Sequence, residues 1–427
     1  MELYIVLGIT LFMIIMFVWH KVPFGVTTMT CCVLLVLTGI MDIPTAFSGF
    51  GNKIVVLLAP FMALSTVLSK TSVVTKISRL MNVAKGKHGM VLVISIFLVA
   101  AIFGQFIPAT ASIAIMVVFM STLGASGEIT PNRLILPLLG ISSAFKFRIP
   151  IGNGATNFAT INAMYEGIMP DGKYALTMID PFLFSIIPMV VLAAYCLFAW
   201  RLMPKDGVVN TQAIEERKDA VAVYSRKQEI IIYVVFIAVT LCMILNKFTG
   251  DLMYLAPAVG VLVLIFTGVL KTQEAVKSMT IDMIWMIAGV LIVADALGKS
   301  GAGELIGNFL LSAIGENPSS FTVMLIFAAV TVITTNFLSN MATQAVFVPI
   351  AASIALAAGW DPRGIILICG IANMFDIAFP SGSGEAAVAY AAGGYNPFKV
   401  LKFTVPYMLL AILSSAISAN LLYPIYG

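Results

Sequence analysis

Apolar residues form long runs along most of this chain, and short polar stretches separate them. Many runs reach the length that a helix needs to cross roughly 30 Å of hydrocarbon at about 1.5 Å per residue. The pattern predicts ten crossings, of which the fourth and the ninth are interrupted. They cover residues 3–19, 23–40, 53–69, 134–166, 181–200, 230–247, 253–270, 283–298, 364–392 and 403–424.

Two further apolar stretches, 90–123 and 321–358, are too long for one crossing. Polar or helix-breaking residues interrupt both near the middle, at Pro108 in the first and at Asn336 and Asn340 in the second. Each stretch therefore predicts a helical hairpin that enters and leaves the membrane by one face.

Polar segments divide the chain into two halves. Residues 70–89 follow the third crossing and predict an interfacial arm, and residues 204–229 form the only extended polar stretch and predict a cytoplasmic linker. The first half then covers residues 1–203 and the second half covers residues 230–427.

The two halves come into register when the first is shifted by about 230 residues. Ala109-Thr110-Ala111-Ser112 then falls on Asn340-Met341-Ala342-Thr343, and Gly152-Asn153-Gly154 falls on Gly382-Ser383-Gly384. Each half has an odd number of crossings, so a second copy must lie upside down relative to the first. The sequence predicts an all-α polytopic membrane protein of two inverted-topology repeats, each with five crossings, one re-entrant hairpin and one broken helix.

Loop charges support this orientation. Most of the 24 Lys and Arg residues fall in loops on the cytoplasmic side if both termini lie outside, as the positive-inside rule expects. The exceptions are five residues that fall outside, Lys53, Lys173, Lys247, Lys299 and Arg363, and two that fall inside a crossing, Lys146 and Arg148. We expect a multi-pass protein of the inner or plasma membrane that contacts the lipid bilayer.

Composition excludes several functions. A net charge of +4 is too small to indicate nucleic-acid binding. The chain has two histidines and five cysteines without CxxC spacing, so a catalytic triad or a zinc site has almost nothing to be built from. We expect no enzyme activity and no resident cofactor.

Four interruptions lie at membrane depth, at Pro108–Ser112, Gly152–Gly154, Ser339–Thr343 and Ser381–Gly384. Unpaired backbone survives there only if it is buried in protein or faces a water-filled site. Broken helices in inverted repeats form the midplane site of many secondary transporters, where helix N-termini hold anions and free carbonyls hold cations. The alternative is that glycine and proline merely kink packed helices.

Several motifs are similar to those of a known family. The chain resembles the divalent anion:sodium symporters (DASS) of the ion transporter superfamily in Phe47-Ser48-Gly49-Phe50-Gly51, Leu136-Pro137-Leu138, Ile151 to Asn157, Ser339-Asn340-Met341-Ala342-Thr343 with Pro349, and Ala378-Phe379-Pro380. The resemblance implies a homodimeric elevator whose hairpins and broken helices carry a di- or tricarboxylate, or a related oxyanion, past a static scaffold.

The hairpin tips depart from the family pattern. Pro108-Ala109-Thr110 stands where the family has Ser-Asn-Thr, and Met341 replaces the threonine of the second tip. Na⁺ takes several oxygen ligands, so at most one well-formed Na⁺ site is expected. The predicted ligands are Thr335, Ser339, Asn340, Ser381 and Gly382, with Gly152 as a second, weaker candidate.

Four ionisable residues inside the interrupted crossings are functional candidates, because burying such groups in a membrane is costly. Arg148 is predicted to hold a carboxylate with its planar fork. Lys146 is predicted to occupy a lost cation site, and the repeat places it opposite Asp376. Glu385 is a candidate carrier of a coupling proton. The alternative is two internal ion pairs that let the crossing helices pack.

These residues support two functions of different kinds. The favoured one is an ion-coupled carrier of a small anion, driven by Na⁺ or H⁺. The alternative is a cation/proton antiporter that uses Asp376 and Glu385. The predicted substrate-binding residues are Thr110, Arg148, Asn153, Asn340, Thr343 and Ser383.

Overall fold

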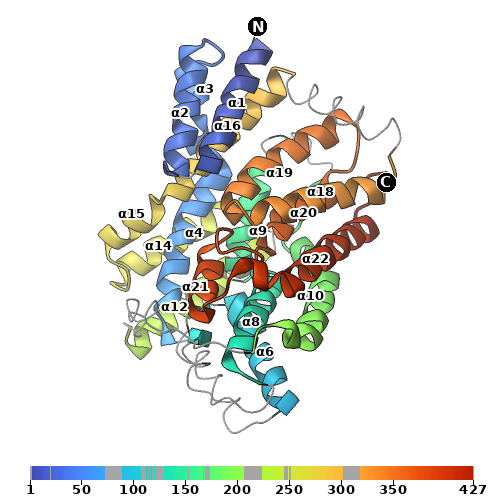
Figure 1. The fold of residues 1–427 in the computed structure, drawn as a ribbon. Coiled ribbons are helices and arrows are strands. Elements are labelled where there is room, and N and C mark those ends of the chain that lie inside the picture. The colour runs from blue at the N-terminus through green and yellow to red at the C-terminus, as the bar shows by residue number, and fades with distance from the viewer. Residues whose placement is uncertain are drawn as a thin grey trace.

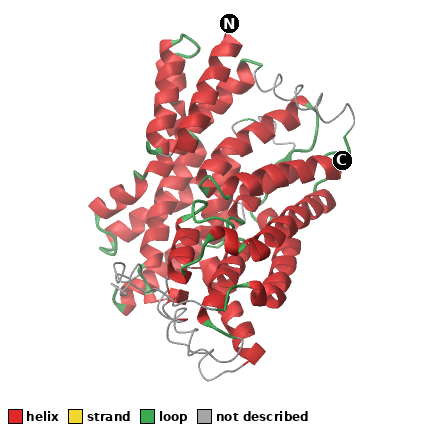
Figure 2. Ribbon diagram, in the orientation of Figure 1, coloured by secondary structure: helices red, strands yellow, loops and turns green. Residues whose placement is uncertain are grey.

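Every regular element in the described part of the computed structural model is a helix, as Figure 2 shows. The predicted all-α class is therefore confirmed for these residues. The first hairpin tip, Gly152, most of the arm and most of the linker lie outside the described residues. The structure describes residues 2–19, 21–72, 89–106, 112–113, 115–117, 120, 129–151, 153–166, 168, 174–205, 224–244, 249, 252–301 and 318–426.

The helices follow the apolar runs closely. The described helices of the first half are α1 (Glu2–Trp19), α2 (Phe24–Leu37), α3 (Ile43–Ala46), η1 (Ser48–Gly51), α4 (Lys53–Ser69), α6 (Gly89–Phe106), α8 (Pro131–Phe145), α9 (Asn153–Glu166), α10 (Asp180–Ala199) and η3 (Trp200–Leu202). Those of the second half are α12 (Arg226–Ile244), α14 (Leu252–Phe266), α15 (Thr272–Met279), α16 (Asp282–Lys299), α18 (Ser320–Thr335), α19 (Asn340–Ala357), α20 (Arg363–Ile371), η4 (Ala372–Met374), α21 (Gly384–Gly393), η5 (Pro397–Lys399) and α22 (Leu401–Leu422).

The packing of the first half recurs in the second. Helix α1 packs on α2 as α12 packs on α14, and α2 packs on α16 as α14 packs on α4. In the same way α8 packs on α10 as α20 packs on α22, and α8 contacts α21 as α20 contacts α9. Two structurally related halves would produce such matching pairs of helix contacts. The inverted orientation of the halves stays a prediction.

Two groups of helices lie side by side in Figure 1. The α2–α16 group consists of α1, α2, α4, α12, α14, α15 and α16, and the α10–α22 group consists of α6, α8, α10, α18, α19, α20, α21 and α22. Helix α9 lies between them, because it contacts α4 and α16 on one side and α19 and α20 on the other.

Contacts between the halves also hold the α2–α16 group together. Gly49, the glycine of the Phe-Ser-Gly-Phe motif, lies so close to α16 that a Cβ there would be 2.1 Å from the carbonyl oxygen of Ala288. Asp282, at the start of α16, accepts hydrogen bonds from the backbone N–H groups of Phe24 at 3.1 Å and Gly25 at 2.9 Å. Its carboxylate thereby caps the positive N-terminal end of α2.

Four segments in the described residues are long and apolar enough to cross a membrane, and several helices of 10–17 residues are also apolar. The four are Asp180–Leu202, Thr272–Leu297, Asn340–Ala357 and Leu401–Leu422. Large apolar side chains such as Leu11, Val190 and Leu409 are exposed on the outside. This pattern fits a multi-pass membrane protein. The number of crossings and the side on which the termini lie stay predictions.

Candidate functional site

Two helical segments are interrupted in the structure: α8–α9 and α20–η4–α21. Residues 146–151 after α8 are not helical, and residues 375–383 separate η4 from α21. Of the predicted interruptions, Asn153 and Gly154 already belong to α9, and Ser381–Gly384 covers only the end of the second gap. Phe147, inside the first gap, has a φ of +58°, and it is the only non-glycine residue with positive φ in the described chain. Such a conformation in a bulky residue requires support from its surroundings.

The side chain of Gln105, at the end of α6, holds the first break. Its Oε1 accepts hydrogen bonds from the backbone N–H groups of Arg148 at 2.8 Å and Ile149 at 2.9 Å. Its Nε2 donates to the carbonyl oxygen of Ile149 at 3.0 Å. One amide thus pairs with three backbone groups of the first break. Gln105 was not among the predicted site residues, although a single amide in an apolar hairpin arm is a detectable signal.

Asn336, at the end of α18, holds the second break in a related way. Its Oδ1 accepts a hydrogen bond from the backbone N–H of Ala378 at 2.7 Å, and its Nδ2 donates to the carbonyl oxygen of Phe375 at 3.4 Å. Asn336 corresponds to Gln105, and Ala378 to Arg148, at the repeat offset of about 230 residues. Asn336 had been predicted only as an interruption of the hairpin. The same type of brace therefore supports both breaks.

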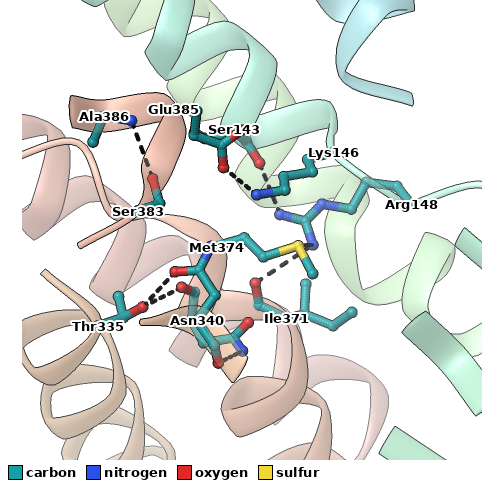
Figure 3. A network of polar contacts seen from close by, with 11 residues as sticks. Ser143, Lys146, Arg148, Thr335, Asn340, Ile371, Met374, Ser383, Glu385 and Ala386 are labelled. Atoms are coloured by element: carbon teal, nitrogen blue, oxygen red, sulfur yellow. Dashed lines mark hydrogen bonds and ion pairs between the residues drawn. The ribbon is translucent and has the colours of Figure 1, made fainter. Parts of the chain in front are cut away.

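A buried ion pair connects the first break with α21. Lys146 and Glu385 point toward each other and pair through Nζ and Oε1 (Figure 3). Their exposed fractions are only 6% and 3%. Asp376 is also buried, lies within electrostatic reach of both, and its Oδ1 has no hydrogen-bond partner in the described residues. The predicted alternative was two internal ion pairs, and the structure shows one here, between Lys146 and Glu385. The predicted roles of Lys146 and Glu385 in coupling stay predictions.

Arg148 is directed into the protein. Its guanidinium donates to the carbonyl oxygen of Ala144 at 3.0 Å. It also donates to the carbonyl oxygens of Ser143 at 3.0 Å and Ile371 at 3.4 Å (Figure 3). The guanidinium carbon also lies 5.3 Å from the centre of the Phe375 ring, and the residue is 1% exposed. Within the described chain Arg148 pairs with no carboxylate. Its predicted contact with substrate stays a prediction, and in this conformation it caps the carbonyl ends of α8 and α20.

Part of the predicted Na⁺ set gathers at the second break. The amide orientation of Asn340 that satisfies both of its ends places its nitrogen 2.9 Å from Thr335 Oγ1, 2.9 Å from the carbonyl oxygen of Asn373 and 3.3 Å from Asp376 Oδ2. Thr335 in turn donates to the Asn373 carbonyl. A Cβ on Gly382 would lie 2.9 Å from the carbonyl oxygen of Thr335, so Gly382 lies beside Thr335 and Asn340 at the second break.

The other two predicted Na⁺ ligands are used to hold local structure. Ser339 Oγ accepts the backbone N–H of Ala342 at 3.2 Å and caps α19. Ser381 Oγ donates to the carbonyl oxygen of Asn336 at 3.1 Å. Their role in cation binding stays a prediction.

The predicted substrate residues occupy the starts of the half-helices. Asn153 begins α9, and Ser383 caps α21 by accepting the backbone N–H of Ala386 at 3.2 Å. Thr343, in the first turns of α19, is fully buried, and its hydroxyl has no partner in the described residues. Thr110, like the Na⁺ candidate Gly152, lies outside the described residues.

Comparisons with known proteins identify the family. The family model described as "Citrate transporter" (CitMHS) matches residues 14–370. An uncharacterized transporter of Synechocystis is 27% identical over 164 residues, which are 38% of this chain and 27% of that protein. The sodium-dependent high-affinity dicarboxylate transporter 3 of Caenorhabditis elegans is 29% identical over 138 residues, which are 30% of this chain and 24% of that protein. These two matches span only a minor part of each relative.

The fold has a solved counterpart. The crystal structure of the Alcanivorax borkumensis YdaH transporter matches with a TM-score of 0.59 and 13% sequence identity, and the match covers 96% of this chain and 98% of that one. The predicted helical transporter fold and the resemblance to the DASS family are confirmed. The family of the matching model is a family of transporters and not of enzymes. Because the family model spans most of its length, the chain belongs to the citrate transporter family.

Proposed function

We propose that this protein is a secondary active transporter that couples the movement of a di- or tricarboxylate to a monovalent cation. The observation that carries the proposal is the arrangement of helix ends. Helices α9, α19 and α21 begin at the two breaks and at the hairpin turn, and their first N–H groups favour an anion. The family description names citrate, and the C. elegans relative is named a dicarboxylate transporter.

Transport follows an elevator mechanism in this proposal. The α10–α22 group, with both breaks, moves past the α2–α16 group, which is the static scaffold of a homodimer with both chain termini outside. The paired helix contacts and the matching braces at Gln105 and Asn336 support the two inverted repeats on which such a movement depends.

The coupling ion of the proposal is Na⁺. Thr335, Asn340 and Gly382 lie together at the second break, where oxygen atoms of Thr335, Asn373 and Asp376 surround the Asn340 amide. The sodium dependence in the name of the C. elegans relative supports the same ion. A proton carried by Glu385 is the alternative.

A second candidate is a cation/proton antiporter. The observation in its favour is the pair of buried carboxylates, Asp376 and Glu385, which lie within electrostatic reach of each other. Lys146 would then be the internal competitor of the transported cation.

Uptake by the purified protein in liposomes distinguishes the two candidates. We expect labelled citrate or succinate to accumulate when a Na⁺ gradient is imposed and not when K⁺ replaces Na⁺. Accumulation that follows a pH gradient alone would replace Na⁺ by H⁺ as coupling ion. Exchange of Na⁺ for H⁺ without any carboxylate would favour the antiporter and contradict the proposal.

A further inference from the structure

Four buried polar side chains lie where α9 and η4 pack against α19. They are Asn157 of α9, Thr343 and Gln344 of α19, and Asn373 of η4, and none is more than 8% exposed. We call this set the amide cluster. It contains no charged side chain, and only Thr343 was among the predicted site residues.

Hydrogen bonds fix the orientation of its amides. Gln344 Nε2 donates to the carbonyl oxygen of Gly370 at 3.1 Å and lies 3.4 Å from Asn157 Oδ1. Asn373 Nδ2 donates to the carbonyl oxygen of Asn340 at 2.8 Å. Since a carbonyl oxygen only accepts, these contacts identify the nitrogen end of Gln344 and of Asn373. The nitrogen of Asn157 then points away from Gln344.

The opposite ends of these groups have no hydrogen-bond partner in the described residues. The unpartnered atoms are Asn157 Nδ2, Thr343 Oγ1, Gln344 Oε1 and Asn373 Oδ1. Buried polar groups in native proteins are normally paired, because an unpaired group keeps the full cost of losing water. Four such atoms on neighbouring elements therefore indicate a bound polar group.

The chemistry of the unpartnered atoms limits what that group is. A carboxylate oxygen only accepts hydrogen bonds, so it would leave Gln344 Oε1 and Asn373 Oδ1 unpaired. A metal ion would face the N–H groups of Asn157. A hydroxyl group can donate to one of the two amide oxygens and accept from Asn157 Nδ2, while the Thr343 hydroxyl donates to the other amide oxygen.

The cluster adjoins the predicted substrate residues. Gln344 lies one helical turn after Asn340 on α19, and Asn373 contacts the Asn340 backbone directly. We propose that the amide cluster binds the hydroxyl group of a hydroxylated di- or tricarboxylate, while the helix N-termini hold its carboxylates. This inference rests on the proposed carboxylate transport and adds a basis for selectivity.

Two pairs of probes differ only in a hydroxyl group: malate against succinate, and citrate against tricarballylate. Uptake into liposomes should favour the hydroxylated member of at least one pair about tenfold, the effect of one to two net hydrogen bonds. Gln344→Met and Asn157→Leu keep similar side-chain volume, and should bring the ratio of the two uptake rates toward one. Thr343→Val should lower the same ratio.

Thr240→Val is the matched control. Thr240 of α12 is also buried, and its hydroxyl also has no partner in the described residues, but it lies in the α2–α16 group. This variant should keep the wild-type ratio. Size-exclusion profiles of all variants show which of them fold.

Three results would overturn the inference. A wild-type protein that transports both members of each pair equally has no hydroxyl subsite, whatever the variants do. Folded cluster variants that lose all four substrates equally would show that the cluster holds only water or packs the helices. Failure to transport any of the four compounds would refute the proposed carboxylate transport itself, and with it the subsite.

Discussion

Replacing Lys146 should lower the free energy of unfolding, because Lys146 belongs to a buried cluster of three charged side chains. Lys146→Met leaves Glu385, 3% exposed, without its partner and within electrostatic reach of a second buried carboxylate, Asp376. Removing one partner of a buried ion pair costs about 3–5 kcal/mol. Glu385→Gln costs less, about 1.5–3 kcal/mol, because the Lys146 ammonium still has Asp376 nearby.

The double variant gives the sharper test. In the wild-type background Glu385→Gln removes an ion pair and lowers the free energy of unfolding. In the Lys146→Met background it removes an uncompensated buried charge and should raise that free energy. Denaturant titration in detergent, extrapolated linearly, measures both effects. The Lys70–Glu274 pair serves as control, because its side chains are 40% and 31% exposed, and Lys70→Met should cost about 1 kcal/mol or less.

The reasoning fails if the effects of Lys146→Met and Glu385→Gln simply add. Additivity would mean that the two side chains do not sense each other, and the buried ion pair would have no energetic role. Equal losses from the two single variants would show that Asp376 does not compensate Lys146.

Three further predictions concern the breaks and the hairpin turn. Gln105→Leu removes three hydrogen bonds from the first break and should lower stability by about 3 kcal/mol and abolish uptake; normal uptake would contradict its role as a brace. Asn340→Ala should weaken the Na⁺ dependence of uptake, and an unchanged response to Na⁺ would place the cation elsewhere. Gly382→Ala puts a Cβ 2.9 Å from the Thr335 carbonyl oxygen and should impair uptake, whereas Gly8→Ala meets nothing within 4 Å and should be tolerated; equal uptake by both variants would refute the close approach.

Helix positions could be predicted from the sequence because they depend on local patterns. The crossing predicted at 181–200 is α10, Asp180–Ala199, and the one predicted at 403–424 is α22, Leu401–Leu422. A run of apolar residues fixes the length of such a helix without reference to its neighbours. The breaks were located less well, because Gln105 and Asn336 determine where the backbone leaves the helix, and each acts on residues about 40 positions away.

The partners of the charged side chains could not be predicted. The repeat offset aligned Lys146 with Asp376, which is a statement about backbone position only. Lys146 lies after the end of α8, so its side chain does not follow helical geometry, and it reaches Glu385 in the first turn of α21 instead. Asp376 meanwhile lies beside the amide of Asn340. Such choices depend on side-chain directions in a loop, for which the sequence has no periodic signal.

Arg148 changes the electrostatic potential at the two breaks. The carbonyl oxygens of Ser143, Ala144 and Ile371 belong to the C-terminal ends of α8 and α20, which carry partial negative charge. By donating to all three, the guanidinium cancels the helix ends that would repel an anion. The N-terminal end of α9, which follows the first break, carries partial positive charge. An arginine buried in this position therefore makes the two breaks less negative, which agrees with the anion binding that we propose.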